Sequence, residues 1–121
     1  MADALKKLKI GSVVLDNNLI LAPMAGVTDL PFRLLCREQG AGLVCMEMVS
    51  AKAIYYQNKN TEELMAIHPG EHPVSLQLFG SDPDIISEMA KKLKRGHFQY
   101  WILTWAVRYL KWLIIRKALH L

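Results

Sequence analysis

The stretch LAPMAGVTDLPFR, residues 21–33, joins an apolar run, a turn and a helix start within thirteen positions. The run begins at Leu19 and ends at Pro23, which is typical of a short buried strand that leads into a loop. Thr28 and Asp29 can cap a helix, and Pro31 suits the first turn of one. The stretch therefore predicts a strand, a loop and a helix in immediate succession.

The same order recurs twice further along the chain. Residues 43–49 form a second apolar run, followed by helical stretches at 51–57 and 61–67, and residues 73–80 form a third. Ser81-Asp82-Pro83-Asp84 then introduces an amphipathic helix. A small hairpin is expected near residues 10–18. Alternating apolar strands and helices are typical of an α/β fold with a parallel sheet and crossover helices.

The chain is short for the fold that this pattern favours. A complete (β/α)8 TIM barrel needs about 250 residues, and the sequence has 121. We therefore expect residues 1–95 to form about three β/α units, the N-terminal portion of such a barrel. Their open sheet edge predicts self-association.

Residues 96–121 differ in character from the rest. They hold all three tryptophans and no Asp or Glu, and their four basic residues account for the net charge of +4. The charge is therefore no sign of a nucleic-acid surface on the folded part. We treat residues 96–121 as a separate, aberrant tail and expect it to collapse onto the open sheet edge as a helix. The run from Trp101 to Ile115 is too short and too charged to span a membrane.

Three places in the predicted sheet are candidates for chemistry, because active sites of such folds form where strands end. The first is the loop Pro23-Met24-Ala25-Gly26, whose small residues let a flat or phosphorylated ligand approach the backbone, or serve only the geometry of a tight loop. The second is Glu47 with Met48, as site-lining residues or as a structural ion pair. The third is Gln77, whose amide can donate and accept at the edge of a heterocycle, or can be a satisfied core amide.

The cysteines and histidines indicate no metal site. Cys36 and Cys45 lack ligand spacing, and no base lies near either in sequence, so buried structural thiols are expected rather than catalytic ones. His68 and His72 flank a proline-containing loop, where we expect exposure to solvent. The first ten residues contain no apolar core of signal-peptide length, so we expect no such peptide and a cytoplasmic location.

Three segments together carry a family resemblance. Residues 21–33, then Gly40-Ala41-Gly42-Leu43 with Glu47-Met48, then residues 74–83 (VSLQLFGSDP) resemble the tRNA-dihydrouridine synthases in order and spacing. The resemblance covers about residues 10–95. Old yellow enzymes and other flavin barrels are similar in the Ala-Pro-Met segment but not in the Asp-x-Pro-Phe-Arg continuation.

The resemblance implies a barrel that binds FMN at its strand ends, is reduced by NAD(P)H and transfers hydride to a uracil of tRNA. By position, Pro23, Met24 and Ala25 would line the flavin and Gln77 would hydrogen-bond its ring. The general acid of the family is a cysteine in an Asn-x-Gly-Cys-Pro loop after the fourth strand. Neither cysteine of this chain matches that position, so no catalytic residue is assigned, and we expect the chain alone to be inactive.

A shift of reading frame accounts for the missing loop. Read from the third base of each codon, residues 96–111 can encode PFSILDINMGCPVPK, which contains a buried strand and an Asn-x-Gly-Cys-Pro loop at the required place. We hypothesise that the sequence from Gly96 onward is a frameshift product, through a pseudogene or a sequencing error.

Two further readings stay open. The basic, aromatic tail could be the working part of a small non-enzymatic protein that binds a membrane surface or a partner; liposome binding lost on deleting residues 97–121 would favour this. The chain could also derive from another FMN-dependent barrel oxidoreductase, as flavin binding without tRNA binding would indicate.

Overall fold

The computed structural model describes residues 5–93, 100–105 and 112–116. The strands in these residues are β1 (Leu8–Ile10), β2 (Val13–Leu15), β3 (Ile20–Leu21), β4 (Leu43–Cys45), β5 (Val49–Ser50), β6 (Val74–Gly80), β7 (Tyr100–Trp105) and β8 (Trp112–Arg116). The helices are α1 (Leu30–Glu38), α2 (Ala51–Tyr55), α3 (Lys59–Leu64) and α4 (Pro83–Leu93), with a single 3-10 turn at Pro69–Glu71.

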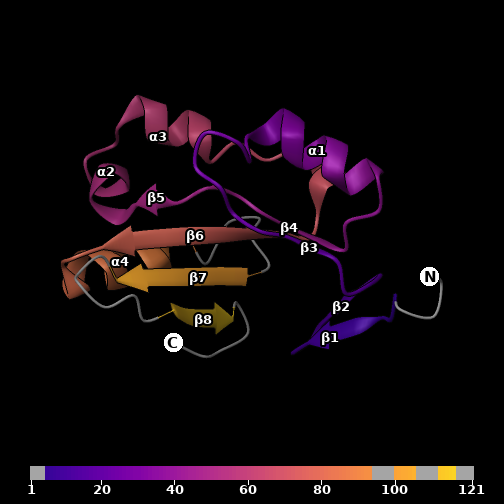
Figure 1. Cartoon of the computed structure of the whole chain (residues 1–121). Coiled ribbons are helices and arrows are strands. Elements are labelled where there is room, and N and C mark those ends of the chain that lie inside the picture. The colour runs from indigo at the N-terminus through magenta and orange to yellow at the C-terminus, as the bar shows by residue number, and fades with distance from the viewer. Residues whose placement is uncertain (1–4, 94–99, 106–111, 117–121) are drawn as a thin grey trace.

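The strands form two sheets. β1 and β2 make an antiparallel hairpin, as the sequence predicts. The larger sheet has the order β3-β4-β6-β7-β8, and the short β5 also pairs with β6. Pairing is parallel from β3 to β7, so the arrows of β6 and β7 point the same way in Figure 1, whereas β8 runs in the opposite direction. The expected parallel sheet of an α/β fold is confirmed.

Helices α1 and α4 begin where the sequence places their caps. The Asp29 side chain accepts a hydrogen bond from the Phe32 amide at 3.0 Å, and Pro31 lies in the first turn of α1. Asp82 does the same before α4, accepting from the amides of Asp84 and Ile85. Each cap satisfies amides that the first helical turn leaves without a partner.

The second apolar run does not form one continuous strand. It divides into β4 and β5 because the two ends pair with β6 in different registers: Cys45 pairs with Ser75, but Val49 pairs with Leu78. Val49 follows Cys45 by four positions, whereas Leu78 follows Ser75 by only three. The segment from β4 to β5 therefore contains one extra residue, as in a β-bulge. The extra length lies at residues 46–48, which includes the candidate residue Glu47.

The core lies between β6 and the helices that cover one face of it. Alternate residues of β6, Val74, Leu76 and Leu78, are fully buried in a cluster with residues of α2 and α4 such as Ile54 and Met89. On the opposite face, the hairpin packs Leu15 against Leu43 and Cys45. Because strand residues alternate between faces, Ser75 and Gln77 share the face of Cys45, not the helix-covered face.

The expectation of a helical tail is wrong for its described residues, which form strands β7 and β8. β7 pairs in parallel with all of β6 from Ser75 to Gly80. The physical reason is twofold. The edge of β6 offers unpaired backbone groups, and the YWILTW sequence of β7 is rich in residues that favour strands.

In the part of the chain that the structure describes, no helix is long and apolar enough to cross a membrane.

Candidate active site at the strand ends

The loop after β3 is held in shape by one buried threonine. Thr28, 1% exposed, accepts a hydrogen bond from the Met24 amide and donates one to the Met24 carbonyl, both at 3.1 Å. The same carbonyl accepts from the backbone amides of Val27 and Thr28 at 3.0 and 2.9 Å. Residues 24–28 therefore form a closed turn whose outer residues, Met24 and Ala25, are exposed to solvent.

Glu47 connects this turn to the segment after β4. Its Oε2 accepts a hydrogen bond from the Gly26 amide at 2.7 Å, although the two residues are 21 positions apart. Gly26 has φ +75, a conformation that favours glycine. Of the two interpretations that the sequence allows for Glu47, the ion pair is not observed among the described residues. The carboxylate instead fixes the backbone of the neighbouring loop.

Gln77 lies in β6, 4% exposed. The pairs Cys45–Ser75 and Val49–Leu78 enclose it, so residues 46–48 run directly beside it in the sheet. On the other side Gln77 pairs with Ile102 of β7. Its side chain is on the face opposite the helix-covered one, beyond the end that the hairpin covers.

The structure thus gathers the predicted site residues at one edge. Leu21 pairs with Val44, so Pro23, Met24 and Ala25 follow β3 at the edge where Glu47 and Met48 follow β4. Met24 and Met48 are 57% and 42% exposed and give this edge an accessible apolar surface. Such a surface, with a few convergent polar groups, suits a flat apolar ligand.

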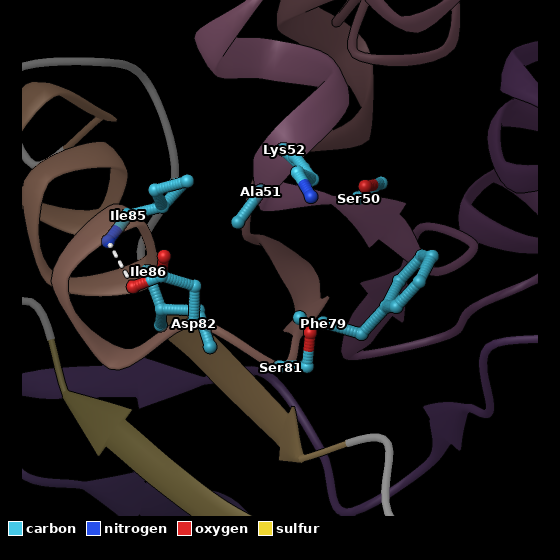
Figure 2. Close-up of a pocket in the computed structure, with 9 residues that line it drawn as sticks. Ser50, Ala51, Lys52, Phe79, Ser81, Asp82, Ile85 and Ile86 are labelled. Atoms are coloured by element: carbon cyan, nitrogen blue, oxygen red, sulfur yellow. Dashed lines mark hydrogen bonds between the residues drawn. The ribbon is translucent and has the colours of Figure 1, made fainter.

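A pocket of about 250 Å³ lies at the next strand ends, between the starts of α2 and α4. Figure 2 shows Ala51, Ile85 and Ile86 among its walls, with Lys52 on the α2 side and the Asp82 carboxylate bonded to the Ile85 amide. The amides at the start of α4 already donate to Asp82, at 2.9 and 3.3 Å. This helix start is therefore not a binding site for a phosphate group.

The sequence reasoning missed a buried ion pair behind the loop. Arg33 and Glu71 are 1% and 0% exposed, and the Nε and Nη2 atoms of Arg33 each lie 3.3 Å from a carboxylate oxygen of Glu71. Arg33 also donates to the carbonyls of Thr28 at 2.8 Å and Ala66 at 3.0 Å. The signal available in the sequence was a lone arginine within an otherwise apolar helix start; nothing local marks Glu71 as its partner.

The two cysteines differ in burial. Burial raises the pKa of the Cys45 thiol to about 11. The expected burial of Cys45 is confirmed, whereas Cys36 on α1 was also expected to be buried and is only partly so. His68 is exposed, as predicted, and accepts from the Gly70 amide, whereas His72 is half-buried. The described residues contain no cluster of groups that could hold a metal ion.

The chain is similar to known proteins over this region. The family model described as dihydrouridine synthase matches residues 20–100. The tRNA-dihydrouridine synthase B of Pseudomonas aeruginosa is 49% identical over 85 residues, which are 69% of this chain and 25% of that protein. The synthase B of Vibrio parahaemolyticus is 46% identical over 85 residues, 69% of this chain and 26% of that protein. A probable tRNA-dihydrouridine synthase of Rickettsia prowazekii is 44% identical, with the same coverage of both chains.

The chain spans about a quarter of the length of these relatives. The matched region contains all three strand–helix units and every candidate residue of the strand-end site. The members named above act, by their names, on uridine of tRNA, and the fold described here is the start of the TIM barrel of these enzymes. The chain therefore belongs to the dihydrouridine synthase family.

Proposed function

We propose that residues 1–95 are the flavin-ring side of an FMN-dependent tRNA-dihydrouridine synthase. The intact enzyme reduces uridine of tRNA to 5,6-dihydrouridine in the cytoplasm, with NAD(P)H as reductant. The observation that carries the proposal is the contact between the Glu47 carboxylate and the Gly26 amide. It joins the two loops of the strand-end site beside Gln77.

The donor set at this edge fits the flavin ring. Gln77 offers both a donor and an acceptor on the face opposite the helix-covered one, and a flavin edge presents both kinds of group. Met24 and Ala25 are exposed in the loop after β3, so the ring has an apolar surface to lie on at the same edge of the sheet. The start of α4 does not fit the phosphate, because Asp82 occupies its amides. We assign the phosphate to parts of the family barrel other than the described residues.

The residues of this chain bind and orient in this proposal. Gln77 would hydrogen-bond the ring, and Pro23, Met24 and Ala25 would line it. Glu47 and Met48 would line the site, and Glu47 holds the loop backbone through Gly26. When bound and reduced, the flavin supplies the hydride that adds to one carbon of the uracil double bond; a general acid then supplies the proton for the other carbon.

We infer that neither cysteine of this chain supplies that proton. The pKa of Cys45, near 11, and its burial make it a poor acid at neutral pH, and Cys36 lies on α1, on the helix that follows the first loop. We therefore propose that the 121-residue polypeptide does not complete the reaction by itself. We also propose that the acid's Asn-x-Gly-Cys-Pro loop is encoded, in a shifted frame, by the DNA for residues 96–121.

The test compares two gene products. The first is the 121-residue chain, and the second is the product of the same gene with the frame restored after the Arg95 codon. NAD(P)H-dependent loss of the 5,6 double bond of uridine is measured on unmodified tRNA. We expect reduction only by the frame-restored product. Reduction by the 121-residue chain, or none by a folded, flavin-bound restored product, would overturn the proposal.

A further inference from the structure

The buried Arg33–Glu71 pair lies outside the strand-end site, yet it is bonded to the loop that builds that site. We propose that Arg33 and Glu71 are positioning residues that hold the loop of residues 24–28 in the shape required for flavin binding. The effect on flavin binding rests on the proposed function. The effect on the conformation of the loop does not depend on it.

Arg33 is the centre of the network. Its guanidinium donates to both oxygens of Glu71, at 3.3 Å each, and to the carbonyls of Thr28 and Ala66, at 2.8 and 3.0 Å. These partners come from three separate parts of the chain: the loop before α1, the segment after α3 and the 3-10 turn before β6. A planar guanidinium can meet such a set of acceptors at fixed angles, and a lysine ammonium cannot.

The hydrogen bond from Arg33 to the Thr28 carbonyl connects the buried network to the loop. Thr28 is itself 1% exposed, and its hydroxyl bonds both backbone groups of Met24. A shift of the Thr28 backbone would therefore displace Met24, which we place against the flavin. Arg33 reaches the loop only through Thr28 among the hydrogen bonds of the described residues, so its effect on a ligand is indirect.

Glu71 links the same network to the other half of the site. It lies in the 3-10 turn that leads, through Val74, into β6 with Gln77. The ion pair thus ties the first loop to the strand that carries the proposed ring contact. Both charges are buried, and loss of either partner leaves the other uncompensated. The network is therefore expected to hold the loop firmly or, when one partner is changed, to release it.

The experiment measures loop order directly, in the full chain. The readout is native-state hydrogen exchange at the amides of Val27 and Thr28, both of which donate to the Met24 carbonyl. The variants are Arg33→Lys and Glu71→Gln, which keep much of the side-chain volume. The control is Met89→Ala, a change in the α4 part of the core cluster, which contains neither Arg33 nor Glu71; it lowers global stability without removing a bond of the network. Riboflavin affinity is measured on all four proteins.

We expect both network variants to lose about tenfold or more in protection at these two amides, as the loss of one charged hydrogen bond implies. Met89→Ala should lower the exchange protection of these two amides only by as much as it lowers global stability. Riboflavin should bind about tenfold more weakly to the network variants than to the control. Unchanged protection in a folded Glu71→Gln variant overturns the proposal, and this variant decides the matter if Arg33→Lys does not fold. Loss of protection with no riboflavin binding by the unmodified chain would support the positioning role and contradict the proposed function.

Discussion

The Glu47 carboxylate and the Gly26 amide, 2.7 Å apart, join the two loops that form the strand-end site. Gly26 precedes Thr28 by two positions, so two contacts hold the same turn. Glu47 bonds it from another part of the chain, and the Thr28 hydroxyl bonds the backbone of Met24 within the turn. The contact also explains why the run at residues 43–49 divides into two strands. The extra residue in this segment gives Glu47 the freedom to leave the ladder and reach the first loop.

Changing Glu47 tests this contact. Glu47→Ala should lower the free energy of unfolding by about 1 kcal/mol, because the amide of Gly26 loses a charged acceptor in a partly exposed place. Glu47→Gln keeps an acceptor of similar shape and should lose about half of that. Urea unfolding measures both. Equal stability of Glu47→Ala and the unmodified chain, with unchanged exchange at the Gly26 amide, would show that the contact is not formed in solution.

Gly42 should not tolerate a side chain. A Cβ at this position would meet the backbone carbonyl of Asn17 and lie 2.8 Å from its Oδ1. Asn17 cannot withdraw easily, because its Nδ2 donates to the Gly40 carbonyl at 2.7 Å. Gly42→Ala should therefore destabilise the chain by about 2 kcal/mol or more, as overpacking does.

Gly70→Ala is the matched control, since the same change there meets mainly the side chain of His68, at 3.1 Å. That side chain is exposed and can move, so the cost should be below about 1 kcal/mol. Thermal or urea unfolding of the two variants compares them. A Gly42→Ala variant as stable as Gly70→Ala would contradict the close approach of residues 17 and 42.

The Cys45 thiol should make stability depend on alkaline pH. Its pKa is about 11 in the folded chain and 9.0 for an unperturbed thiol. The unfolded chain therefore releases this proton first as pH rises. The stabilising effect is complete below pH 9 and is lost between pH 9 and 11, by about 2 to 3 kcal/mol. Cys45→Ala should reduce the slope of unfolding free energy against pH in this range.

Cys36→Ala is the control for that measurement and should leave most of the slope in place. The difference in burial between the two cysteines predicts their reactivity: at pH 8, a thiol reagent should label the partly buried Cys36 in the folded chain and reach the buried Cys45 only on unfolding. Fast labelling of both cysteines in the folded chain would contradict the burial of Cys45.

The reading-frame hypothesis makes a prediction about DNA. Beginning at the Gly96 codon, the third base of each codon and the first two of the next should spell a strand followed by Asn-x-Gly-Cys-Pro. Sequencing the gene on both strands, with its flanking DNA, checks this. A shifted frame that lacks the cysteine loop would end the hypothesis and would leave the tail as an authentic sequence.

Much of the fold was predictable from local signals. Asp29 and Asp82 cap the helices that their sequences indicate, and the order of strands and helices needs only apolar runs and turn residues. The helix α2 was predicted two residues too long, because pattern alone does not show that Gln57, with φ 55, turns the chain. The next helix was predicted at residues 61–67, but α3 begins and ends earlier, at Lys59–Leu64. The open sheet edge and the packing of the tail against it were expected, but the tail was predicted as a helix because composition does not show that its backbone pairs with β6 as a strand.

The common location of the candidate residues could be predicted from the sequence, but the hydrogen bonds and the ion pair that connect them could not. Pro23, Glu47 and Gln77 each follow or occupy a strand, so parallel pairing brings them to one edge. That Glu47 bonds Gly26, and that Arg33 pairs with Glu71 at a separation of 38 positions, depends on the three-dimensional arrangement. No single segment of the sequence contains such long-range information.

The most direct test of the central claim is the flavin affinity of the 121-residue chain with and without Gln77. Fluorescence quenching gives the dissociation constants of riboflavin and FMN for the unmodified chain and for Gln77→Met, with thermal unfolding as a check on folding. We expect the two flavins to bind within about twofold of each other, since the described residues hold only the ring, and Gln77→Met to weaken both by about tenfold. A folded Gln77→Met variant that binds flavin as well as the unmodified chain, or a folded chain that binds none, would contradict the account.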